Sequence, residues 1–213
     1  MFEELSLTLI IIIITVISSF LAFNDKDLQY KLMMSPYQVK HHKEWHRLIT
    51  HAFVHKDYLH LFMNMYVMYL FGKEGFGLEK KFTLDFGSAG LYYFGLLYFG
   101  GFLFATLPSM KRHGDNPNYL SLGASGAVSA VVFSTIVLFP TQGIGLIFIP
   151  GIFIPAFIFG FLYLSYEMYM DKRGGTGVAH DAHLWGALYG VIYTFLLHPD
   201  YLKEFVAQVK NAF

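Results

Sequence analysis

The stretch LGASGAVSAVVFSTIVLFP occupies residues 122–140 and contains no charged side chain. After its small residues, it is apolar apart from Ser129, Ser134 and Thr135. A helix that is apolar on all sides is either buried in a large core or spans a membrane. The length of this segment is close to the roughly 20 residues that a spanning helix needs. The segment therefore predicts a membrane helix, with Ser125 at or just inside its N-terminus.

Five other apolar segments have a similar character: Ser6 to Phe23, about Asp57 to Gly72, Leu84 to Leu107, Leu146 to Met170, and Ala179 to Leu197. Together with residues 122–140 they predict an all-α, polytopic membrane protein with six transmembrane helices and one membrane domain over residues 1–213. The composition agrees, because 55% of the residues are hydrophobic and only 14% are charged. A soluble domain carries about 25% charged residues. The net charge of zero disfavours a nucleic-acid-binding protein, which would show a basic excess.

The connections differ in length and charge. Residues 24–56 form a long first loop, and residues 201–213 alternate apolar and charged side chains, as in a short interfacial tail helix. Residues 1–4 are acidic rather than basic at their charged positions, so we interpret the first segment as a retained helix and not a cleaved signal peptide. With an internal N-terminus, ten Lys and Arg residues would lie outside and five inside. The positive-inside rule points the other way, so charge leaves the membrane orientation open.

Polar side chains interrupt apolar segments in three places, and such groups are costly in a membrane. His60 and Asn64 are four residues apart and share a helix face. They indicate either a functional pair or an interhelical contact. Ser125 lies in Gly123-Ala124-Ser125-Gly126, at a helix start where free N–H groups stabilise a developing anion. Taken alone, it is explained better by close helix packing than by catalysis.

His183 lies one helical turn before Gly186 and Gly190, a pair typical of close helix approach. A histidine above such a contact can reach a side chain on the neighbouring helix. His180 lies on the same stripe, one turn earlier and nearer the loop. Asp181 is two residues from His183 and points to a different side of a helix, which disfavours it as a third catalytic member. Glu167 is interpreted as an interfacial residue.

These residues together supply what nucleophilic acyl transfer requires: a hydroxyl nucleophile, a base, and donors for an oxyanion. The chain has no cysteine, which excludes disulfides, thiolate zinc sites and cysteine catalysis. Its ten histidines do not form a metal motif such as H-E-x-x-H, so we expect neither a metal nor another cofactor.

The sequence resembles the rhomboid family of intramembrane serine proteases over about residues 44–197. The resemblance is carried by residues in three segments: Glu44-Trp45-His46-Arg47, Thr50-His51-Ala52-Phe53, His55, His60, Asn64, Gly123-Ala124-Ser125-Gly126, and Ala182-His183 with Gly186 and Gly190. It implies a six-helix bundle with a water-accessible cavity, in which small residues including Gly123, Gly126, Gly186 and Gly190 support helix packing.

The resemblance also implies roles. Ser125 would be the nucleophile and His183 the general base, a dyad without a carboxylate, and His60, Asn64 and the Ser125 N–H would form the oxyanion hole. The substrates would be single-span membrane proteins, and the location would be the lipid bilayer of a bacterial inner membrane. Ser129 stands where well-known members carry an aromatic residue that stacks on the histidine.

Other interpretations remain open from the sequence. A catalytically inactive rhomboid-like chaperone or trafficking factor would share the fold, and a membrane transporter would use the polar cavity for transit. Pro150 and Pro155 in the fifth segment predict a bent helix, which would be either a substrate gate or an ordinary kink.

Overall fold

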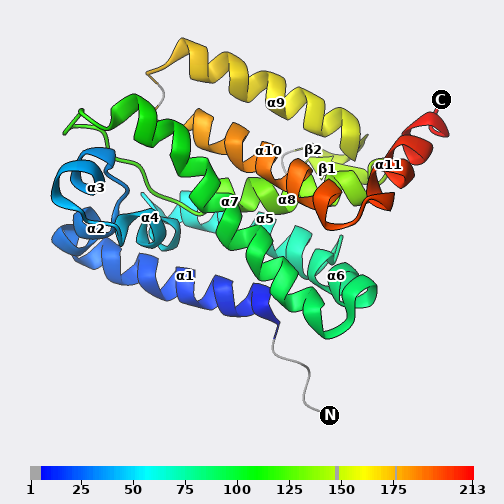
Figure 1. Cartoon of the computed structure of the whole chain (residues 1–213), viewed down its shortest axis with the longest axis horizontal. Coiled ribbons are helices and arrows are strands. Elements are labelled where there is room, and N and C mark those ends of the chain that lie inside the picture. The colour runs from blue at the N-terminus through cyan, green and yellow to red at the C-terminus, as the bar shows by residue number, and fades with distance from the viewer. Residues whose placement is uncertain (1–5, 147–148, 176) are drawn as a thin grey trace.

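The computed structural model describes residues 6–146, 149–175 and 177–213, and these are mostly helical (Figure 1). Residues 1–4, whose acidic side chains argue against a cleaved signal peptide, lie outside the described residues. The elements are α1 (Leu7–Asn24), α2 (Lys26–Leu32), α3 (Pro36–His42), α4 (Arg47–Thr50), η1 (His51–Phe53), α5 (Tyr58–Gly72), α6 (Leu78–Phe86), η2 (Gly87–Ala89), α7 (Gly90–His113), α8 (Ser125–Leu138), β1 (Gly143–Leu146), β2 (Ile149–Pro155), α9 (Ala156–Arg173), α10 (His180–Leu197) and α11 (Asp200–Lys210).

Helix α8 is the centre of the fold. Every residue from Gly126 to Leu138 is buried, as expected for a helix that is apolar on all sides. Helices α10, α7, α5 and α9 pack around it. In Figure 1, α1 and α9 lie on opposite sides of the bundle, with α7, α8 and α10 between them. The prediction of a helix over residues 122–140 is confirmed, with its first residue at Ser125.

Glycine residues set the distance between α8 and α10. A Cβ atom on Gly186 would lie 2.1 Å from the carbonyl oxygen of Gly126, and one on Gly190 would lie 2.3 Å from that of Ala130. Both separations are impossible for real atoms, so only glycine allows this approach. Gly126 also meets Ala105 of α7, where an added Cβ would come within 2.6 Å. Gly123 differs, because it lies in the turn before α8.

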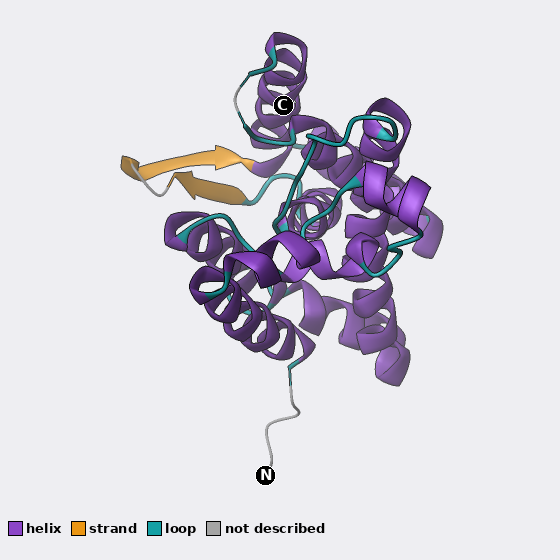
Figure 2. Ribbon diagram, turned by 90° about the vertical axis from the view of Figure 1, so that its left-hand side faces the viewer, coloured by secondary structure: helices purple, strands orange, loops and turns teal. Residues whose placement is uncertain are grey.

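The predicted fifth helix is wrong in its first half. Strands β1 and β2 pair antiparallel, with Gly143 opposite Pro155 and Gly145 opposite Phe153, and residues 147–148 of the predicted helix lie outside the described residues. This hairpin stands out from the helices in Figure 2. Helix α9 begins only at Ala156. If the helix extended further toward the N-terminus, Pro155 would lie inside it, where it has no N–H to donate to the carbonyl four residues earlier. Pro150 and Pro155 therefore lie in a strand, and they do not bend the fifth helix as predicted.

The predicted third helix is displaced. The apolar run from Leu84 is broken at Gly87, whose φ of 60° ends α6. Helix α7 then starts at Gly90 and continues through Lys111 and Arg112, where positive side chains suit the helix C-terminus. The long first loop contains three short helices and a 3₁₀ turn, and the tail helix is confirmed as α11.

By length and composition, two helical segments in the described part of the chain are able to cross a membrane, Leu7–Asn24 and Leu78–His113. Helix α8 is apolar but shorter. The mostly helical architecture is thus established, whereas the count of six spans stays a prediction.

Candidate active site

The turn before α8 is fixed by the first loop. The N–H of Gly123 donates to the His51 carbonyl at 2.9 Å, and the N–H of Ala124 donates to His55 Nε2 at 3.3 Å. His55 Nδ1 in turn lies 3.0 Å from Ser19 Oγ on α1. Burial lowers the pKa of His55 to about 3, so its ring is neutral and its Nε2 can accept. His55 therefore links α1 to the start of α8.

Gly123 needs to be glycine for two reasons. Its φ is 122°, a conformation that other residues rarely adopt. A Cβ atom here would also lie 2.8 Å from the His60 ring. The turn delivers Ser125 as the first residue of α8, where its backbone N–H has no partner within the helix.

Ser125 and His183 are brought together by the close approach of α8 and α10. His183 Nε2 lies 2.8 Å from Ser125 Oγ, a hydrogen-bond distance. His183 stands one turn before Gly186, whose lack of a side chain lets α10 approach the Gly126 backbone this closely. Gly186 and Gly190 thus allow the close helix approach that brings His183 within hydrogen-bond distance of Ser125.

Glu167 was not predicted at this site. Its side chain extends from α9 and is buried, not interfacial, and it contacts two histidines of α10. Glu167 Oε1 lies 3.0 Å from His183 Nδ1, and Oε2 lies 2.5 Å from His180 Nδ1. A signal was present in the sequence, since an acid within an apolar helical segment is expected to have a partner. The sequence alone could not identify that partner.

The other acid near His183 has a different contact. Asp181 Oδ2 lies 3.5 Å from Arg112 of α7, and its Oδ1 accepts from the N–H of Ala182 at 2.9 Å. Arg112 also pairs with Asp171 of α9 at 3.0 Å. Asp181 therefore contributes to an ion-pair group that joins three helices.

His60 and Asn64 come from α5 and line the same cavity as Ser125 and His183. The His60 ring lies against Gly123 and makes an edge contact with His55, with ring centroids 4.9 Å apart. Asn64 is buried and donates to the carbonyl of His60 at 2.9 Å. An Asn side-chain amide has two N–H groups, so this bond leaves a second donor.

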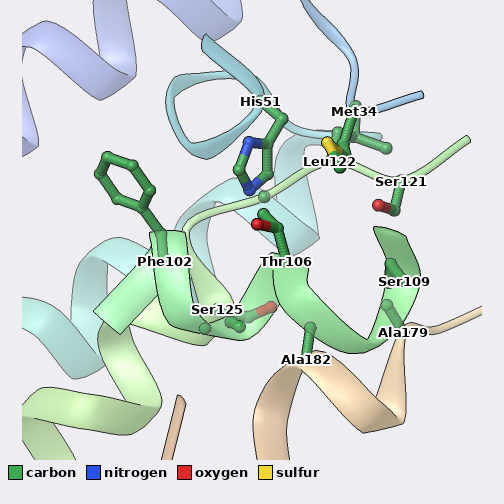
Figure 3. Close-up of a pocket in the computed structure, with 13 residues that line it drawn as sticks. Met34, His51, Phe102, Thr106, Ser109, Ser121, Leu122, Ser125, Ala179 and Ala182 are labelled. Carbon is green, nitrogen blue, oxygen red and sulfur yellow. The ribbon is translucent and has the colours of Figure 1, made fainter. Parts of the chain in front are cut away.

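Two cavities adjoin Ser125. The larger has a volume of about 1210 Å³, and its lining includes His60, Asn64, Ser125, Glu167 and His183. The smaller has a volume of about 30 Å³, enough for a water molecule. Figure 3 shows the smaller one, with Ser125, His51 and Thr106 projecting around it from different elements.

Ser129, which occupies the position of the expected aromatic residue, contacts α9 instead. Its Oγ lies 3.4 Å from the hydroxyl of Tyr163, one turn before Glu167. The ring beside His183 is that of His180, with centroids 6.1 Å apart and nearly perpendicular planes. Glu167, His180 and His183 also present three donor atoms within 4.8 Å of one another, a spacing compatible with a shared metal ion.

A helical bundle built around a half-buried serine, with a histidine at hydrogen-bond distance, matches a known membrane-protein class. The family model for the rhomboid domain matches residues 42–200. The chain belongs to the rhomboid family, whose members are integral membrane proteins. The resemblance inferred from the sequence is thus confirmed.

Three relatives give the degree of similarity. RHOMBOID-like protein 12, mitochondrial, of Arabidopsis thaliana is 31% identical over 178 residues, which is 80% of this chain and 51% of that protein. Presenilin-associated rhomboid-like protein A, mitochondrial, of Danio rerio is 27% identical, over 68% of this chain and 36% of that protein. Rhomboid-like protein 11, chloroplastic, of Arabidopsis thaliana is 27% identical, over 81% and 60%. The chain thus spans about half the length of these relatives.

Proposed function

We propose that this protein is an intramembrane serine protease that cleaves single-span membrane proteins in or near their transmembrane segments. The observation that carries the proposal is the 2.8 Å separation of Ser125 Oγ and His183 Nε2. A serine hydroxyl is a weak nucleophile until a neighbouring base takes its proton. An inactive rhomboid-like protein or a transporter has no need of this pair.

In the proposed reaction, Ser125 Oγ attacks the carbonyl carbon of the scissile peptide bond while its proton passes to His183 Nε2. The carbonyl oxygen becomes an anion, which the Ser125 N–H, His60 and Asn64 stabilise. His183 then gives the proton to the leaving amine as the C–N bond breaks. A water molecule then attacks the acyl carbon and gives a proton to His183 Nε2, which passes it to Ser125 Oγ as the acyl C–O bond breaks. Water-sized space beside Ser125 supports this last step. No metal or other cofactor enters these steps.

The proposal includes six spanning helices in a lipid bilayer. Large apolar side chains are exposed on helices all round the bundle, among them Ile13, Leu59, Phe161 and Leu196. Soluble monomers rarely expose such extensive apolar surface. We place the protein in a bacterial inner membrane, and membrane fractionation of cells producing the full chain tests this location. The organelles in the relatives' names describe those proteins.

The test of the activity uses the purified protein in detergent micelles with a fluorophosphonate probe and a panel of tagged single-span proteins. The wild type should label and cleave, and Ser125→Ala should do neither. Ser134→Ala is the matched control, since Ser134 is buried on the same helix and bonds to Thr194 rather than to the site. Cleavage by Ser125→Ala at the wild-type rate would refute the protease proposal. Absence of both labelling and cleavage in the wild type would favour the inactive rhomboid-like alternative.

A further inference from the structure

A base that acts without an orienting group must be held by its surroundings. In this chain, Ser129 occupies the position at which the family resemblance predicts an aromatic side chain beside His183. The structure supplies a carboxylate in its place, from a different helix. Glu167 of α9 contacts the nitrogen of His183 that faces away from Ser125.

The chemistry of the groups fixes the proton positions. A carboxylate accepts hydrogen bonds and cannot donate, so His183 Nδ1–H donates to Glu167 Oε1 over 3.0 Å. The proton on Nδ1 leaves Nε2 with a free lone pair, 2.8 Å from Ser125 Oγ. Nε2 can therefore accept the serine proton. Glu167 thus selects the tautomer that the proposed reaction requires.

Glu167 is itself held in position. Its second oxygen accepts from His180 Nδ1 at 2.5 Å, and the side chain is only 4% exposed. Gly160, two turns earlier on the same helix face, packs against Phe133 and Ile136 of α8. This contact turns the face that carries Glu167 toward the bundle interior. His180 and the packing of α9 therefore restrict the carboxylate to one position.

The distances favour hydrogen bonds over a metal site in the same cluster. Ligands at 2.0–2.2 Å from a tetrahedral zinc ion lie about 3.4 Å apart. The two N···O separations here are 2.5 and 3.0 Å, both shorter than that and both within hydrogen-bond reach. The cluster is thus already satisfied by its own protons.

We infer that Glu167 is a positioning residue for His183, so that Ser125, His183 and Glu167 form a triad in which α9 supplies the carboxylate. The inference rests on the proposed protease function. When Ser125 transfers its proton, His183 becomes positively charged, and the negative charge of Glu167 stabilises it. In soluble serine proteases, changing the corresponding carboxylate lowers the rate by up to about 10⁴-fold.

The test compares Glu167→Ala and Glu167→Gln with a matched control, Glu79→Ala. Glu79 is also a buried glutamate, but it lies on α6 and bonds to the start of α1. Probe labelling of Ser125 and cleavage of a single-span reporter are measured per folded molecule. We expect Glu167→Ala to lose about 10²–10⁴-fold in kcat with little change in KM. Glu167→Gln, which keeps one acceptor oxygen but no charge, should fall between, and Glu79→Ala should match the wild type.

A second readout does not depend on activity. Ring ¹⁵N signals of His183, assigned by their loss in His183→Gln, should show a protonated Nδ1 and a bare Nε2 in the wild type. Glu167→Ala should disturb that pattern, and Glu79→Ala should not. Wild-type rates and an unchanged His183 signal in Glu167→Ala would overturn the triad while leaving the protease proposal intact. If the wild type itself is inactive, the protease proposal fails, and an unchanged His183 signal then overturns the positioning role as well.

Discussion

Two buried glutamates in this protein, Glu79 and Glu167, both have their carboxylate oxygens hydrogen-bonded, but to different kinds of donor. Glu79 accepts from Ser6 Oγ at 2.8 Å, from the N–H of Leu7 at 2.8 Å and from the N–H of Thr8 at 2.9 Å. Glu167 accepts from the two imidazoles of α10. Each carboxylate has both oxygens bonded, as buried charges require.

The donors explain the difference between the two glutamates. The partners of Glu79 are a hydroxyl and two free N–H groups at a helix N-terminus, and none of them changes its protonation. One partner of Glu167 is the proposed base, which gains and loses a proton in each turnover. A buried acid on fixed donors therefore contributes to stability, whereas the same acid on a titrating donor contributes to reaction rate. The following predictions test this distinction.

The largest expected effect is that of His183→Ala. Removal of the base in a soluble serine protease lowers kcat by about 10⁶-fold. The effect of Glu167 should disappear in this background, because a positioning residue acts only through the group that it holds. The measurement is the cleavage rate of His183→Ala and of the double variant with Glu167→Ala. A further tenfold loss in the double variant would show that Glu167 acts by another route.

Asn64→Ala should have the next largest effect. Loss of one oxyanion donor costs about 2.7–4 kcal/mol in transition-state stabilisation, which is 10²–10³ in kcat. The reporter-cleavage rate should therefore be low but measurable. Labelling of the purified variant checks that Ser125 is still present and accessible. Wild-type kcat would remove Asn64 from the proposed oxyanion hole and leave its bond to the His60 carbonyl as its role.

Glu79→Ala should lower stability rather than rate. It leaves three donors at the start of α1 without their acceptor, and a buried unsatisfied group costs about 1–3 kcal/mol. Unfolding in mixed micelles should show this loss, while the rate per folded molecule stays at the wild-type value. A fall in rate equal to that of Glu167→Ala would contradict the distinction between the two glutamates.

The sequence predicted the pieces of this site better than their connections. The start of an apolar span placed Ser125 at a helix start, and the Gly186–Gly190 spacing placed His183 over a close contact, because both are properties of one helix. Glu167 was missed as a partner because its contact depends on how α9 packs against α10. That arrangement is tertiary, and spacing along the chain does not report it.

The errors in helix boundaries have a related cause. Apolar content alone cannot separate a strand from a helix in a short run, so the hairpin before α9 was taken into the fifth helix. Gly143, Gly145 and the proline at residue 155 were the available signals. Gly87 similarly ended α6 inside a run that was predicted as continuous. At these two places, glycine and proline residues therefore indicate the helix boundary better than hydropathy does.

The smallest expected effect belongs to a third carboxylate, on the exposed side of the first loop. Arg47 is 2% exposed, and its Nε donates to Glu44 at 2.5 Å while Nη1 donates to the carbonyls of Tyr30 and Met33. The bond to Arg47 holds the pKa of Glu44 below its usual value of 4.5. The ion pair therefore stabilises the fold above about pH 4.5, and this contribution is lost as the pH falls through the lowered pKa.

Glu44→Gln should therefore be less stable than the wild type at neutral pH by at most about 1 kcal/mol, since the carboxylate is partly exposed and Arg47 keeps its two carbonyl acceptors. The difference should shrink as the pH falls below about 4.5, because the wild-type carboxylate then becomes protonated. Thermal unfolding of both proteins between pH 3 and pH 7 measures it. If the stability difference between the two proteins widens on acidification, Glu44 is stabilised in its neutral form. If the difference is as large as the loss in Glu79→Ala, the exposure of a carboxylate matters less to stability than the number of donors that it accepts from.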